Sequence, residues 1–71
     1  MPPPDLTALF NTILTFLQRR PLTLPEIDYL IKATATQQGY RLPTEAEVQQ
    51  IIRTLIHAAN INTTLSIKGD Y

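Results

Sequence analysis

Apolar residues recur every three or four positions along most of the chain and every second position near its end. The first spacing is that of an amphipathic helix, and the second is that of a half-buried strand. The helical spacing covers three stretches, residues 5–20, 24–38 and 44–60, whereas the alternation covers residues 61–67. The pattern therefore predicts a mainly α chain with three helices and one short C-terminal β-strand.

Sequence signals mark both ends of the first helix. Asp5 is a good N-cap because its carboxylate can accept a hydrogen bond from a free amide of the first turn. Pro21 cannot continue a helix and disfavours helical geometry at Arg20, so the helix ends there. Residues 1–4 contain three consecutive prolines and form an extended, poorly ordered lead-in. Such tracts occur in SH3 ligands, but no basic residue flanks this one, which favours a rigid start before the helix.

The second helix starts at a capping box. The Thr23 hydroxyl can accept a hydrogen bond from the N–H of Glu26, while the Glu26 carboxylate accepts one from the N–H of Thr23. Leu22 and Ile27 occupy the positions of a hydrophobic staple, which fixes the angle at which the chain enters the helix. Gly39 suits the left-handed position that ends the helix.

The third helix repeats these signals, with Thr44 and Glu47 as its capping box. Asn60 suits a left-handed position at its end, and Ile61 is the apolar residue that follows. One face of each helix then encloses a common core. We predict that this core contains Leu9, Ile13, Leu17, Ile27, Leu30, Ile31, Val48, Ile52 and Leu55.

The residues after the third helix predict a strand with an unpaired edge. Ile61, Thr63, Leu65 and Ile67 alternate with polar residues, but no second strand is evident. An unpaired edge leaves backbone N–H and C=O groups that another chain can bind. Alternatively, the Gly-Asp turn that follows makes a stub hairpin that blunts the edge. Tyr29, on the solvent side of the second helix, is a further interface candidate because exposed tyrosines are enriched at interfaces.

The order of these elements resembles the winged-helix family of helix-turn-helix domains. The resemblance covers residues 6–71 and rests on element order and on the stretch AEVQQIIRTLIHAANI, residues 46–61, which looks like a third helix that precedes the wing. It implies one winged-helix-like domain over residues 5–71. The chain departs from the family pattern in two ways: the returning wing strand is absent or reduced to Tyr71, and the third helix opens with two acids.

The resemblance also implies a nucleic-acid hypothesis, because helix-turn-helix proteins place this helix in the major groove of DNA. Its solvent side carries Gln49, Gln50, Arg53 and His57, and Gln and Arg side chains can bind adenine and guanine edges. The six basic residues are spread over every element, however, and two acids lie at the start of the helix. We therefore rank DNA binding second, after binding of a protein partner or a second copy through the strand.

Composition narrows the remaining function classes. The 71 residues carry six basic and six acidic side chains and no cysteine, so disulfides and zinc–thiolate sites are excluded. His57 and Ser66 are the only residues of their types, and no glycine-rich phosphate loop is present. We therefore expect no enzymatic activity, no cofactor, no metal and no small-molecule substrate. The absence of a signal segment and of a long apolar run predicts a cytoplasmic protein without a membrane span.

Overall fold

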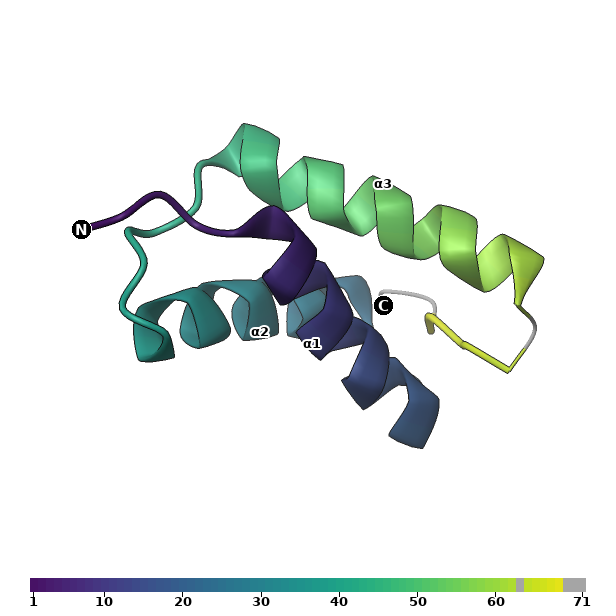
Figure 1. Cartoon of the computed structure of the whole chain (residues 1–71). Helices are drawn as coiled ribbons and strands as arrows, with labels where there is room; N and C mark the ends of the chain where they lie inside the picture. The colour runs from purple at the N-terminus through teal and green to yellow at the C-terminus, as the bar shows by residue number, and fades with distance from the viewer. Residues whose placement is uncertain (63, 69–71) are drawn as a thin grey trace.

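The structure is a computed structural model, and it describes residues 1–62 and 64–68. Three helices dominate it: α1 (Leu6–Arg19), α2 (Leu24–Gln37) and α3 (Glu45–Ile61) (Figure 1). The prediction of a mainly α chain with three helices is confirmed, and each end differs from the predicted end by no more than one residue. No helix in the described part is long and apolar enough to cross a bilayer.

Side chains close the start of every helix, as the sequence predicts. The Asp5 carboxylate accepts a hydrogen bond from the N–H of Ala8 at 3.1 Å. At the start of α2, the Thr23 hydroxyl accepts from the N–H of Glu26 at 3.2 Å, and the Glu26 carboxylate accepts from the N–H of Thr23 at 2.9 Å. The same reciprocal pair is present at the start of α3. Both capping boxes are therefore confirmed.

The end of α2 is a Schellman motif. Gly39 has a φ of +83°, which is the left-handed conformation predicted for it. The N–H of Gly39 donates to the carbonyl of Thr36 at 3.1 Å, and the N–H of Tyr40 donates to the carbonyl of Ala35 at 3.0 Å. The chain thus reverses at once and leads into α3.

The core lies where the three helices meet, and it contains most of the predicted residues. Of the nine predicted side chains only Leu30 is half-buried rather than buried. Four further apolar residues join the buried set, and two of them lie outside the helices, one between α1 and α2 and one after α3. These additions are Leu22, Ala35, Ile51 and Leu65.

The N-terminal lead-in is attached to the rest of the domain. It has no regular secondary structure, and in Figure 1 it crosses the connection between α2 and α3. The carbonyl of Pro2 accepts a hydrogen bond from the N–H of Arg41 at 2.9 Å, and Pro4 is buried. Through these contacts the lead-in packs against the connection between α2 and α3.

The end of α3 differs from the prediction. The helix continues through Ile61, and no described residue other than glycine has a positive φ, so the left-handed role predicted for Asn60 is wrong. Asn62 ends the helix instead. Its side-chain oxygen accepts hydrogen bonds from the N–H and the hydroxyl of Thr64 at 3.0 and 2.7 Å. This side-chain turn replaces the left-handed cap because Asn can form it without a positive φ.

The strand predicted over residues 61–67 is not shown by the described residues of that range, and its first residue, Ile61, belongs to α3. Of the described residues in this range, only Ile67 pairs in a sheet-like manner, in a single parallel bridge to Leu22 in the connection between α1 and α2. The alternation is real over the last described residues, because Leu65 is buried, Ile67 is half-buried, and Ser66 and Lys68 are exposed. Among the described residues a longer ladder does not form, because α3 takes up Ile61 and the next N–H on this side of the connection, that of Arg20, is bonded to the carbonyl of Phe16 at the end of α1.

Candidate functional site

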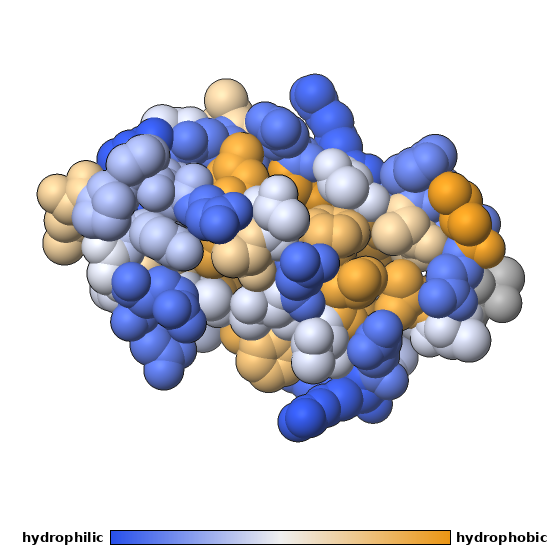
Figure 2. Space-filling model, in the orientation of Figure 1, coloured by the Kyte–Doolittle hydropathy of each residue, from blue (hydrophilic) through white to orange (hydrophobic). Residues whose placement is uncertain are grey.

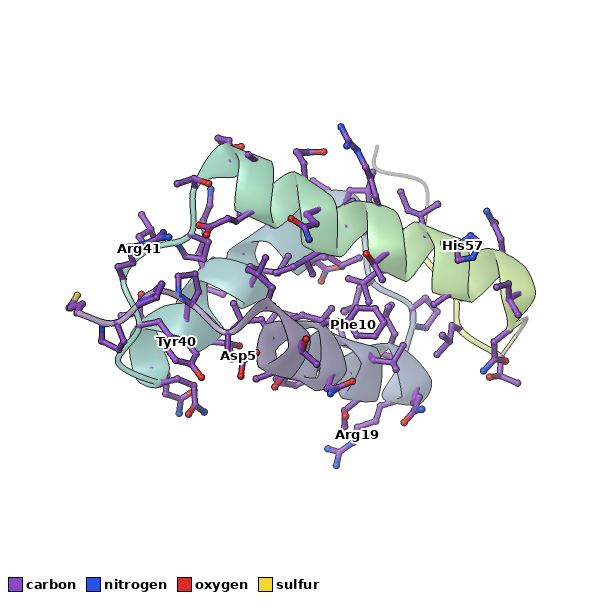
Figure 3. All side chains as sticks on the ribbon, turned by 45° about the horizontal axis from the view of Figure 1, so that its top comes forward. Asp5, Phe10, Arg19, Tyr40, Arg41 and His57 are labelled. Carbon is purple, nitrogen blue, oxygen red and sulfur yellow. The ribbon has the colours of Figure 1, made fainter. Side chains whose placement is uncertain are left out.

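The four residues proposed to read DNA lie on the outer side of α3. Gln49, Gln50, Arg53 and His57 are all exposed, and Figure 3 shows His57 on the outer surface of the helix. The structure therefore brings them together on one solvent-facing stripe. Arg53 is the only Lys or Arg in this stripe. Side chains of this kind can donate and accept hydrogen bonds, but the stripe supplies little positive charge.

Half of the basic residues are already paired with carboxylates. The distances are 3.2 Å for Arg20–Glu26, 3.1 Å for Lys32–Asp28, 3.4 Å for Lys32–Glu45 and 2.8 Å for Arg41–Glu47. Among the described residues this leaves three of the six basic side chains outside ion pairs, and they come from different elements: Arg19, Arg53 and Lys68. The surface therefore lacks the concentrated positive charge that phosphate contacts need.

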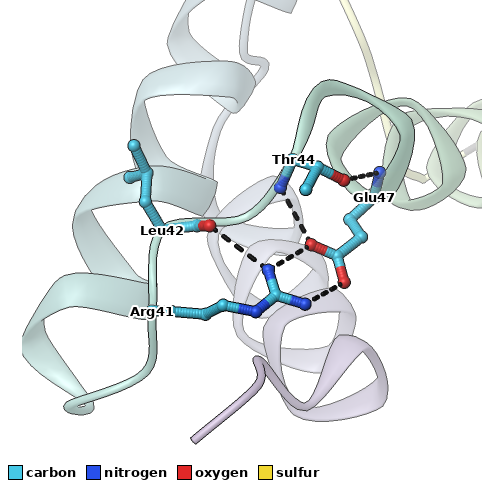
Figure 4. Close-up of polar contacts among 4 residues, drawn as sticks. All are labelled: Arg41, Leu42, Thr44 and Glu47. Atoms are coloured by element: carbon cyan, nitrogen blue, oxygen red, sulfur yellow. Dashed lines mark hydrogen bonds and ion pairs between the residues drawn. The ribbon is translucent and has the colours of Figure 1, made fainter. Parts of the chain in front are cut away.

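The strongest of these pairs is part of the start of α3. Arg41 donates from two guanidinium nitrogens to the two carboxylate oxygens of Glu47, at 2.8 and 3.0 Å (Figure 4). Glu47 also accepts from the N–H of Thr44 at 2.8 Å. The Arg41 hydrogen bonds, followed by that of Thr44, lower the pKa of Glu47 from 4.5 to about 2. This cluster holds the connection before α3 against the first turn of the helix.

Lys32 joins α2 to α3 in a second polar cluster. Its ammonium contacts Asp28 one turn earlier and Glu45 at the start of α3. These contacts with carboxylates, that with Asp28 first, raise the pKa of Lys32 above its ordinary 10.5. The sequence pattern missed this cluster and the Arg41–Glu47 pair. Only the (i, i+4) spacing of Asp28 and Lys32 gave a readable signal.

The candidate interface residues do not form one patch. Tyr29 is 71% exposed and lies on α2, beside a hollow lined also by Arg20 and Pro25. Ile61 is 72% exposed at the end of α3, whereas Leu65 is only 6% exposed and belongs to the core. Thr63 lies outside the described residues. The side chain of Leu65 is therefore not part of a docking surface, although its backbone follows the edge of the C-terminal segment.

The backbone of that segment has one paired edge and one outer edge. Leu22 donates its N–H to the carbonyl of Ser66 at 3.4 Å and accepts from the N–H of Lys68 at 2.8 Å. Successive residues of an extended chain direct these groups to opposite edges. The N–H and C=O of Ile67 therefore point away from Leu22. Within residues 1–62 and 64–68 neither group has a hydrogen-bond partner.

A hollow of about 380 Å³ adjoins this segment, and five of its seven lining residues are apolar. It has no charged side chain, and the exposed Ile56 of α3 forms part of its wall. Its lining consists of Leu24, Ile56, Ala59, Asn60, Leu65, Ser66 and Ile67. An extended backbone bound at the outer edge of residues 65–68 would thus lie close to an apolar surface.

A second apolar surface follows the line where α1 meets α3. Figure 2 shows hydrophobic side chains gathered there, and Figure 3 places Phe10 between the two helices. The hollow at this line measures about 160 Å³, and Thr7, Gln50 and Thr54 are its polar lining residues. None of these groups is an acid, a base or an activated nucleophile, so the hollow offers no catalytic chemistry.

Metal-ligand side chains do not cluster in the described part of the chain, where no three His, Asp or Glu residues come together. His57 and Ser66 are both exposed, and neither has a hydrogen-bond partner that would activate it among the described residues. The strongest candidate site is therefore the outer edge of residues 65–68. Compared with protein-family models, with curated proteins and with solved structures, the chain matches none of them.

Proposed function

We propose that this chain is a non-enzymatic module that binds a protein through the outer edge of residues 65–68. The observation that carries the proposal is the direction of the N–H and C=O of Ile67, which point away from Leu22 and have no partner within the described residues. Groups of this kind bind an added strand in proteins that recognise extended peptides.

The other outer edge of the bridge, on the far side of Leu22, offers no comparable donor. Leu22 uses both of its backbone groups in the bridge, and Pro21 has no N–H. Thr23 donates its N–H to Glu26 within the capping box. A new strand therefore finds no donor beyond Leu22, whereas it finds a donor and an acceptor at Ile67.

DNA binding by α3 is the second candidate. The exposed stripe of Gln49, Gln50, Arg53 and His57 favours it, because these side chains are suited to base edges. The ion pairs of Arg20, Lys32 and Arg41 weigh against it, since they remove positive charge from contact with phosphates.

We propose in addition that the domain is winged-helix-like. The order of the three helices supports this, and so does the bridge between Leu22 and Ile67. That bridge joins the connection between α1 and α2 to the segment after α3. The wing itself would require residues beyond Lys68.

A binding screen on the ¹⁵N-labelled full chain tests the proposal. The protein is offered a phage-displayed library of short peptides, and separately mixed-sequence duplex DNA at low and high salt. We expect selected peptides to shift the amide resonances of residues 65–68, and DNA to cause no shifts. Shifts at Arg53 and His57 with DNA, weakening steeply as salt rises, would instead support the DNA candidate.

A backbone variant identifies the edge. The chain is short enough for chemical synthesis, so Ile67 can carry an N-methyl group that removes its N–H and keeps its side chain. We expect peptide binding to be lost, while the matched control Gln50→Ala with Arg53→Ala binds as the parent does. Peptide binding that survives N-methylation of Ile67 would contradict the proposed edge.

A further inference from the structure

We propose that the strand bound at this edge is the same segment of a second copy, paired antiparallel with Ile67 on the two-fold axis. This inference rests on the proposed function and names the partner of the same site. The two copies would form a closed, symmetric dimer in which each edge satisfies the other.

The direction of the backbone groups sets the register. The N–H and C=O of Ile67 both face the outer edge, while Ser66 and Lys68 face Leu22. In an antiparallel pair, two residues that exchange both hydrogen bonds lie directly opposite one another. Ile67 of one copy opposite Ile67 of the other therefore satisfies four backbone groups with one symmetric pair.

This register also places charges favourably. With Ile67 on the axis, Ser66 of one copy lies opposite Lys68 of the other, in a non-hydrogen-bonded pair whose side chains are close. Two lysines never face each other directly, as they would if the axis passed through Lys68. Both Ser66 and Lys68 are exposed in the single chain, so their side chains are available for this contact.

Apolar surface adds to the pairing. Ile67 is half-buried and lies on the face of the segment that carries Leu65, beside the hollow walled by Ile56 and Ala59. In the dimer the two Ile67 side chains become cross-strand neighbours on this face. Self-association also protects an edge that otherwise remains open to pairing with any extended chain.

Charge variants at Ser66 test the register. Sedimentation equilibrium gives the dissociation constant of the dimer for the parent, Ser66→Glu, Ser66→Lys, and the double variant Ser66→Lys with Lys68→Glu. We expect Ser66→Glu to tighten the dimer and Ser66→Lys to weaken it, each on the order of threefold to tenfold at low salt. The double variant restores opposite charges across the axis, so it should associate about as tightly as Ser66→Glu.

Two controls separate this inference from the proposed function and from folding defects. Thermal melts of dilute protein should change little among the variants, because both positions are exposed. High salt should reduce the differences between them. A parent that stays monomeric at every concentration contradicts the dimer, even if peptides still bind at Ile67 and the proposed function stands. A dimer whose dissociation constant is indifferent to the charge at Ser66 contradicts this register.

Discussion

The three helices and the segment after them differ in how firmly each backbone is held. Each helix start has a side-chain acceptor from Asp5, Thr23 or Thr44 in addition to the ladder within the helix. Among the described residues, the segment at 64–68 has two backbone bonds to Leu22, of 2.8 and 3.4 Å, and one of 3.1 Å from the N–H of Leu65 to the carbonyl of Asn62. Local opening needs the least free energy where backbone bonds are few and exposed. The helical part is therefore the scaffold, and the C-terminal segment is the part that we propose binds a partner.

The largest expected effect is on the scaffold. Leu55 is completely buried on α3 in the shared core. We expect Leu55→Ala to lower the free energy of unfolding by about 2–5 kcal/mol, which is a large share of the stability of so small a domain. Urea denaturation followed by circular dichroism measures it. A free energy of unfolding equal to that of the parent would show that this face of α3 is not the core.

The same substitution in the C-terminal segment, Leu65→Ala, should lower the free energy of unfolding less than Leu55→Ala does. Leu65 is buried too, but its backbone is held by fewer bonds and can shift into the space that a smaller side chain leaves. We expect Leu65→Ala to lower the free energy of unfolding by about 2 kcal/mol or less, with helix content unchanged. Equal losses of unfolding free energy for Leu55→Ala and Leu65→Ala would contradict the claim that the C-terminal segment is held less firmly than the helices.

The caps give a smaller effect. The Thr44 hydroxyl accepts from the N–H of Glu47, so Thr44→Ala should lower the free energy of unfolding by about 1 kcal/mol. Thr54 lies in the middle of α3, and its hydroxyl donates to the carbonyl of Gln50, which already belongs to the helix. Thr54→Ala should therefore be nearly neutral. Similar losses at both positions in a urea titration would contradict the start assigned to α3.

The smallest effect depends on pH. The pKa of Glu47 is lowered from 4.5 to about 2 in the folded state, so the carboxylate contributes stability that is complete above pH 4.5 and is lost as the pH falls toward 2. We expect Glu47→Gln to flatten this decline when the free energy of unfolding is measured between pH 5 and pH 2. Glu26→Gln should flatten it less, because Arg20 reaches Glu26 with a single, more exposed hydrogen bond. If Glu26→Gln flattened the decline more than Glu47→Gln, the Arg20–Glu26 pair would be the stronger of the two, which contradicts the account.

Most of the helical scaffold could be predicted because its signals are local. A capping box, a staple or a Gly at the end of a helix involves residues within a few positions of one another, so the sequence shows both partners together. Thr23, Thr44 and Gly39 act as predicted for this reason. Asn60 misled because a second asparagine, Asn62, lies two residues later and ends the helix through its side chain.

The candidate site was predicted less well because its contacts are distant in sequence. The alternation over residues 61–67 predicted a strand, of which the described residues show one bridge at Ile67, and nothing local revealed that Leu22 is its partner. The pairing of Arg41 with Glu47 likewise depends on how the connection before α3 turns. The bonds from Leu22 to Ser66 and Lys68 determine which edge of the segment remains open. That edge could therefore be derived only from the structure.

Amide exchange at two adjacent residues tests the central claim, that the outer edge of the C-terminal segment is the docking edge. The N–H of Lys68 donates to Leu22, whereas that of Ile67 points outward. In dilute protein we expect the Ile67 amide to exchange faster than the Lys68 amide, after correction for intrinsic rates, and to become protected as association or peptide binding rises. An Ile67 amide that is as protected as Lys68 in dilute protein, or that does not respond to association or peptide binding, would contradict it.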